Sequence, residues 1–204
     1  MPDVAEQSAK HGQSLTGLYI AVGVLAMLVV LGAVLWQPLR AWYHEPYERE
    51  LIFDRVVSRC RNYVEAQALY RAKDWNKDGR MEYAHPFGLL ASSWDENGNE
   101  IQLIDGAFAQ ADGLGNSLPA TGYYFRDCQT IGGVAIDWGR DFALSAYPAV
   151  YGRTGYRAFI VGTDGVVWAK DLGRAKPVAD FPADPGKAGW KRVELRKREE
   201  QGLK

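Results

Sequence analysis

The run Arg157-Ala-Phe-Ile-Val161, joined through Thr163-Asp164-Gly165 to Val166-Val-Trp-Ala169, decides the fold that this sequence predicts. Both flanking runs are short and rich in β-branched and aromatic residues, and an Asp-Gly pair lies between them. This combination is typical of a two-stranded β-hairpin. Two upstream runs, Gly122–Phe125 and Phe142–Tyr147, are also short and contain aromatic residues, as strands do, so we expect an antiparallel sheet in the second half of the chain.

A helix is predicted before these strands, over residues 47–73. Apolar side chains recur there at steps of three or four residues, with charged residues between them. The apolar stripe consists of Ile52, Val56, Cys60, Tyr63 and Val64. Two shorter helices are expected at Phe87–Ser93 and Leu103–Ala111. A helix followed by strands predicts an α+β fold, in which the helix covers one face of an antiparallel β-sheet.

The N-terminal part of the chain is strongly apolar. No charged residue occurs between Gly12 and Leu39, and this interval supplies the roughly 20 apolar residues that a bilayer core requires. The run is longer than the apolar region of a signal peptide, which is about 7–15 residues. Tyr19 and Trp36 lie near its ends, where such rings favour the membrane interface. We therefore predict a single uncleaved transmembrane helix over residues 15–37.

The sequence thus divides into five predicted segments. They are a disordered N-terminal tail (1–14), the transmembrane helix (15–37), a juxtamembrane linker (38–46), an α+β domain (47–190) and a charged C-terminal tail (191–204). Arginines after the apolar run would place the following domain in the cytoplasm, but glutamates accompany them. The flanking charges alone therefore leave the orientation in the membrane open.

Composition excludes some classes of function. The 204 residues carry a formal net charge of −1, so no general affinity for nucleic acid is expected. We found no nucleotide-binding, hydrolase or metalloprotease motif, and we predict that the protein is not an enzyme. His85, the single histidine inside the predicted domain, is expected to be structural or exposed. Cys60 and Cys128 are either one disulfide or two separate buried thiols.

Aromatic residues make up 12% of the chain, and most are expected to fill the core. One group could instead line a recognition surface, since such rings are favoured in interfaces. Its members are Tyr123, Tyr124, Trp138, Tyr147, Tyr151 and Tyr156. Three aspartates, Asp137, Asp141 and Asp171, are interpreted as turn residues rather than as a catalytic carboxylate pair.

An Asp-rich loop, Asp74–Glu82, is the candidate metal site. Oxygen side chains at positions 1, 3 and 5 and Gly79 at position 6 match the opening of a calcium-binding loop. The candidate ligands are Asp74, Asn76, Asp78, Arg80 through its backbone carbonyl, and Glu82. Position 12 is His85, a poor calcium ligand, and Asp-rich turns also form without metal. Calcium is therefore the one cofactor hypothesis, with a metal-free turn as its alternative.

Several runs after residue 47 occur together in a recognisable order. They are Tyr63–Arg71, Asp74–Gly79, Glu82–Ala84, Leu103–Asp105, Gly122–Phe125, Phe142–Pro148, Tyr156–Val161, Asp164–Gly165 and Val167–Asp171. This order resembles bacterial type IV pilin-like and pseudopilin-like proteins, especially a poorly characterised set with an Asp-rich loop after the long helix. The resemblance covers residues 47–190 and implies a pilin-like fold, a cytoplasmic N-terminus and an extracytoplasmic domain.

These inferences predict a membrane-anchored, pilin-like structural or interaction protein of the bacterial inner membrane, with its C-terminal domain in the periplasm. Its expected partners are membrane lipid and other membrane or envelope proteins. The alternative is an accessory subunit that covers the extracytoplasmic face of a larger integral membrane complex. The lack of a glutamate between Gly12 and Leu39, where pilins carry one, favours this alternative. A membrane-tethered hydrolase or small-ligand-binding module is a third, more distant hypothesis.

Overall fold

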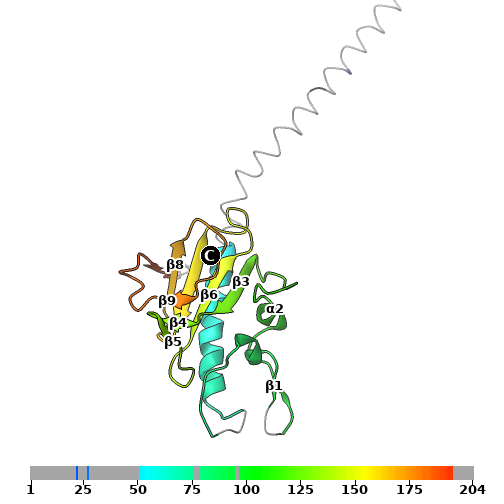
Figure 1. Cartoon of the computed structure of the whole chain (residues 1–204). Coiled ribbons are helices and arrows are strands. Elements are labelled where there is room, and N and C mark those ends of the chain that lie inside the picture. Colours follow the sequence, from blue (N-terminus) through cyan, green and yellow to red (C-terminus); the bar gives the residue numbers. More distant parts are fainter. Residues whose placement is uncertain (1–21, 23–26, 28–50, 76–78, 95–96, 195–204) are drawn as a thin grey trace, which may run out of the picture. The chain divides into compact units, whose positions relative to one another are not determined.

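The computed structural model divides the chain into two units, Met1–Glu48 and Arg49–Lys204. Figure 1 shows the strands and the long helix of the second unit. The described residues are 51–75, 79–94 and 97–194, together with Val22 and Met27. The predicted tail, transmembrane helix and linker (1–14, 15–37 and 38–46) therefore lie outside the described residues, apart from Val22 and Met27. Among the described residues, no helix has both the length and the apolar character needed to cross a bilayer.

A long helix over residues 51–71 opens the second unit. In its predicted apolar stripe, Val56, Cys60 and Tyr63 have no exposed surface, and Ile52 and Val64 are partly buried against the same core. The helix packs against a sheet through aromatic contacts. The rings of Phe53 and Phe159 are 5.2 Å apart, and those of Tyr63 and Phe142 are 5.4 Å apart. The helix is therefore fixed by one apolar face, while its charged residues remain outside.

The rest of the described unit is built mainly from strands. In chain order they are β1 Ser93–Trp94, β2 Glu100–Ile101, β3 Tyr123–Asp127, β4 Thr130–Ile131, β5 Val134–Ala135, β6 Ala143–Pro148, β7 Arg157–Gly162, β8 Val167–Asp171, β9 Asp180–Phe181 and β10 Lys191–Arg192. A 3₁₀ turn, η1 (Phe87–Leu90), and a one-turn helix, α2 (Gly106–Ala109), complete the elements.

The strands form three sheets. The central antiparallel sheet has the order β10-β8-β7-β6-β3, a smaller one has the order β5-β4-β9, and β1 pairs with β2. The first two residues of the predicted C-terminal tail thus form β10 and join the central sheet.

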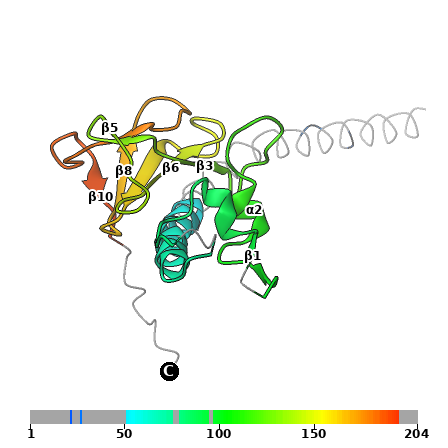
Figure 2. The same ribbon diagram turned by 60° about the horizontal axis from the view of Figure 1, so that its bottom comes forward.

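Both faces of the central sheet are covered. Along β7, Phe159 and Val161 point into the core shared with the helix, while Ala158 and Ile160 point into a second core. Phe181 of β9 belongs to this second core. Figure 2 shows the helix on one side of the central sheet and β5 on the other. The sheet is therefore the middle layer of three.

The predicted fold class is wrong. We expected an α+β fold with a single N-terminal transmembrane helix, followed by a helix packed on one antiparallel β-sheet as in pilins. The described chain is instead mostly β, with ten strands in three sheets and one long helix. Six of the strands are only two residues long, which is too short for a visible alternation of apolar and polar residues. The expected helices at Phe87–Ser93 and Leu103–Ala111 are single turns.

Two local predictions are settled by the described residues. The hairpin is confirmed, because β7 and β8 pair antiparallel and Gly165 adopts a positive φ of 69° in the turn. Both cysteines are buried and free. Of the two alternatives for Cys60 and Cys128, separate buried thiols are therefore correct.

Candidate functional site

A buried carboxylate, Asp127, organises the end of the domain at which β3 finishes. Its side chain is 7% exposed, and Oδ1 accepts a hydrogen bond from the Tyr63 hydroxyl at 3.1 Å. Oδ2 accepts the backbone N–H of Phe87 at 2.8 Å and lies 3.0 Å from Nδ1 of His85. A carboxylate can occupy an apolar interior only with such partners. Asp127 therefore holds its three neighbours in fixed positions.

Gln67 connects this network to the backbone. It lies on the long helix with no exposed surface. Its Nε2 donates to the Tyr63 hydroxyl and to the Ala84 carbonyl, both at 2.9 Å, and its Oε1 accepts the Ala84 N–H at 2.8 Å. Both peptide groups of Ala84 are thus paired with one side chain. The segment that carries His85 is consequently fastened to the helix.

Tyr63 acts as a permanent donor in this network. Burial raises the pKa of its hydroxyl well above the usual value, and the nearby charge of Asp127 raises the pKa further. The phenol therefore keeps its proton and can always donate to the carboxylate.

His85 is held from two sides. Its Nδ1 faces the buried carboxylate of Asp127, and its ring stacks on Trp138 with centroids 3.9 Å apart and planes 13° apart. The side chain is still 47% exposed. In the neutral ring, a proton on Nδ1 directed at Asp127 leaves Nε2 as an acceptor. The structure thus presents one oriented imidazole to the outside.

The exposed side of His85 opens into a cleft of about 580 Å³, here called the aromatic cleft. Five aromatic side chains line it, namely Tyr70, Trp75, Tyr83, Trp94 and Trp138. The remaining lining residues are Glu82, His85, Leu89, Ser92 and Ser93. This volume lies in the usual range for small-molecule sites, about 300–1,000 Å³. Apolar ring faces with a few polar groups between them are the typical lining of such sites.

Several of these rings are fixed before any ligand binds. Tyr83 packs edge-on against Phe142 at 4.7 Å, and Arg71 donates to its hydroxyl at 3.0 Å. The indole N–H of Trp75 donates to the Tyr70 carbonyl at 2.7 Å. Trp94, in contrast, is 62% exposed on β1. A tryptophan with that much free surface is unusual, because its large apolar ring gains most from burial.

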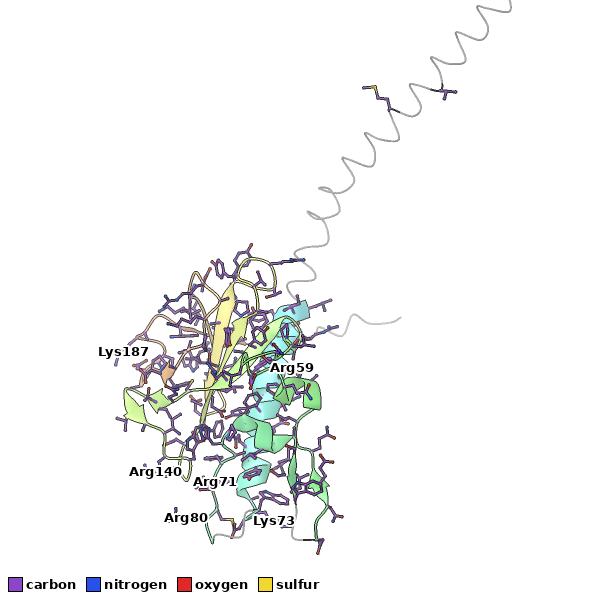
Figure 3. All side chains as sticks on the ribbon, turned by 45° about the vertical axis from the view of Figure 1, so that its right-hand side comes forward. Arg59, Arg71, Lys73, Arg80, Arg140 and Lys187 are labelled. Atoms are coloured by element: carbon purple, nitrogen blue, oxygen red, sulfur yellow. The ribbon has the colours of Figure 1, made fainter. Side chains whose placement is uncertain are left out.

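Cations surround this end of the domain without belonging to the cleft lining. Arg71 lies 4.8 Å from the ring centre of Tyr83, and Lys73 lies 4.7 Å from that of Trp75. Figure 3 shows Arg71, Lys73 and Arg80 at the same end of the domain. Positive charge is therefore already placed against two of the cleft's rings.

The candidate calcium loop adjoins the same end, and only part of it is described. Asp74 accepts the backbone N–H of Gly79 at 2.8 Å, which closes the loop. Asn76 and Asp78 lie outside the described residues, and Glu82 lines the aromatic cleft. In the part of the chain that the structure describes, no cluster of three or more His, Cys, Asp or Glu side chains could hold a metal ion. Calcium binding thus stays a prediction.

A larger cleft of about 910 Å³ lies at the start of the long helix. Charges of both signs line it, including Asp54, Arg157, Lys170 and Asp171. Two of them already have partners, because Lys170 donates to the Ala188 carbonyl and Asp171 accepts from Tyr151. Three aromatic side chains line this cleft, against five in the aromatic cleft, so it is the weaker candidate despite its size.

Most of this site could not be predicted from the sequence. His85 and Asp127 are 42 residues apart, so spacing could not pair them. One signal was present: Asp127 continues the buried alternation of Tyr123 and Phe125, and a charge at a core position of a strand requires partners. Of the proposed recognition aromatics, only Trp138 lines the aromatic cleft.

The three aspartates interpreted as turn residues behave differently. Asp137 and Asp171 accept backbone N–H groups two residues ahead, as turn residues do. Asp141 instead accepts from the Thr163 hydroxyl.

Comparison with known proteins gives one match. A family described as "Protein of unknown function (DUF2950)" matches residues 50–193. Nothing among the curated proteins or the solved structures matches the chain. The description of the family does not mention pilins, so the pilin-like resemblance stays a prediction.

Proposed function

Because this chain belongs to the DUF2950 family, whose function is unknown, we propose a function from the site: the domain is a non-catalytic recognition module whose aromatic cleft binds a small ligand or a short segment of a larger one. One observation carries the proposal. His85, oriented by Asp127 and Trp138, opens into a cleft lined by aromatic rings. Such a combination of ring faces and convergent polar groups is the usual form of a binding site.

Binding is favoured over nucleophilic catalysis by the state of the candidate nucleophiles. The hydroxyl of Ser93, on the cleft lining, donates to the Leu89 carbonyl at 2.6 Å. Both cysteines are buried, and burial raises the pKa of Cys60 to about 12 and that of Cys128 well above its usual value. At neutral pH these thiols are protonated and inert.

We also propose where the module works. The apolar run over residues 15–37 would anchor it in the bacterial inner membrane, with the domain on the extracytoplasmic side and envelope components as partners. Hydropathy supports the anchor, and the resemblance stated above supports the orientation. Protease treatment of intact and of permeabilised cells tests the orientation. Cleavage of the domain only after the inner membrane is opened would contradict it.

A ligand screen tests the binding function. The full chain in detergent would be melted with compounds of three classes: neutral saccharides, acidic saccharides and quaternary ammonium compounds. A ligand at 100 times its Kd adds about 2.7 kcal/mol to the stability, which is roughly 5–11 °C for a domain of this size. We expect one class to raise Tm in the wild type and in the exposed control Leu118→Ala, but not in Trp94→Ala. No shift with any class, or equal shifts in Trp94→Ala, would refute the function.

A further inference from the structure

We propose that the aromatic cleft binds the uncharged pyranose rings of a glycan. This inference rests on the proposed binding function and names its ligand class. The starting point is the two-sided character of the cleft, which joins ring faces to hydrogen-bonding groups. A pyranose ring has the complementary character, with C–H groups on its faces and hydroxyls around its rim.

The ring faces suit the apolar side of a sugar. The face of an aromatic ring carries negative charge and attracts polarised C–H groups laid flat against it. Trp94 offers the largest free face, since it is 62% exposed. Trp138 has one face covered by His85 and belongs to the same cleft. Covering Trp94 with a sugar would remove from water the apolar surface that the free domain leaves exposed.

The polar groups suit hydroxyls. Nε2 of His85, in the neutral ring, can accept a hydrogen bond, and the Ser92 hydroxyl both donates and accepts. A hydroxyl can both donate and accept a hydrogen bond, so a polyhydroxylated ligand can pair with donors and with acceptors in the cleft. A purely apolar ligand would leave these groups desolvated without partners.

Charge disfavours the main competitors. A quaternary ammonium ligand would use the aromatic faces, but Arg71 and Lys73 already lie against the rings of Tyr83 and Trp75. A like charge in the same cleft is therefore repelled. An anionic ligand would be repelled by the Asp127 carboxylate behind His85 but attracted by Arg71 and Lys73, so the acidic probe below tests it directly. An uncharged ligand avoids both penalties.

Titration calorimetry and tryptophan fluorescence on the full chain can test this ligand class. The detergent must have no sugar headgroup, because a maltoside would itself present pyranose rings. The neutral probes are the tetramer of N-acetylglucosamine, cellotetraose and maltotetraose. A galacturonate tetramer and choline represent the acidic and the cationic class. Pelleting with insoluble peptidoglycan separates a polymeric source from a free oligosaccharide.

We expect at least one neutral tetramer to bind, and its Kd to rise about tenfold or more in Trp94→Ala. His85→Ala should weaken binding as well, whereas Leu118→Ala, 78% exposed and outside the cleft, should not. Tighter binding of choline or galacturonate that Trp94→Ala abolishes would overturn the glycan inference and leave the binding function intact. Binding of a neutral tetramer that survives in Trp94→Ala would overturn the site. If no probe binds, the glycan inference is overturned. The thermal-shift screen described above then decides the binding function.

Discussion

Replacing Asp127 by alanine should destabilise the domain far more than its single missing carboxylate suggests. The change leaves two buried donors without acceptors, the Tyr63 hydroxyl and the Phe87 N–H. Each buried donor without an acceptor lowers the free energy of unfolding by about 1–3 kcal/mol, so the two together lower it by about 2–6 kcal/mol. His85 is half exposed and can turn to water. Because a buried charge is also removed, we expect the lower part of the range, about 2–4 kcal/mol.

Thermal unfolding of the full chain, followed by circular dichroism, measures this cost. For a domain of this size the loss corresponds to a Tm roughly 4–16 °C lower. Asp127→Asn keeps the shape and one acceptor, so it should cost less, about 1–2 kcal/mol. The matched control is Asp112→Ala, which removes an exposed hydrogen bond to the Leu114 N–H and should change stability by less than about 0.5 kcal/mol.

The order of the three variants decides whether the reasoning is right. If Asp127→Ala has the same Tm as the Asp112→Ala control, the Asp127 network does not stabilise the fold and the prediction is refuted. A double-mutant cycle between Asp127→Asn and Tyr63→Phe adds a second check, because the two side chains share one hydrogen bond. Additive effects would show that this bond carries no coupling energy.

Three further predictions concern other parts of the domain. Gly155→Ala should lower the free energy of unfolding by about 1–3 kcal/mol, since the added Cβ would overlap the Tyr123 hydroxyl. A urea titration measures this loss, and Gly88→Ala is its control, because a Cβ at Gly88 meets open space and should leave the stability unchanged. If the Asp74 loop binds calcium, Tm should rise with calcium and fall with chelator in the wild type but not in Asp74→Ala; equal melting curves would exclude the site. Burial raises the pKa of Cys60 from 9.0 to about 12, so its contribution to stability is complete below pH 9 and is lost as pH rises toward 12. Urea midpoints across this interval should fall less steeply in Cys60→Ala, and parallel curves would contradict the assignment.

Local sequence patterns predicted the elements that are long enough to show a period. The stripe from Ile52 to Val64 marked the helix, and the Asp-Gly turn marked the β7–β8 hairpin. The two-residue strands escaped prediction because their partners are set by distant backbone. β4, for example, pairs with β9 through Thr130 and Asp180. The mostly β character of the domain could not be inferred without those pairings.

The site was harder to predict than the fold, for a related reason. Its central contact joins His85 to Asp127 across 42 residues, and its rings come from the helix end, the loop after it, β1 and the turn that carries Trp138. Each of these residues has an ordinary local explanation. Only the folded chain brings them to one cleft, so a single sequence gives no reason to group them.

Gln67 shows how one side chain on a helix can hold a neighbouring loop segment. The backbone groups inside a helix are already bonded to one another, so a helix cannot extend a neighbouring strand with its own peptides. Here a carboxamide, which has the same donor and acceptor as a peptide unit, pairs with both groups of Ala84 in their place. Glutamate has the same shape but can only accept, and asparagine is one carbon shorter. Glutamine is therefore the side chain that makes both bonds at position 67 without a change of protonation state.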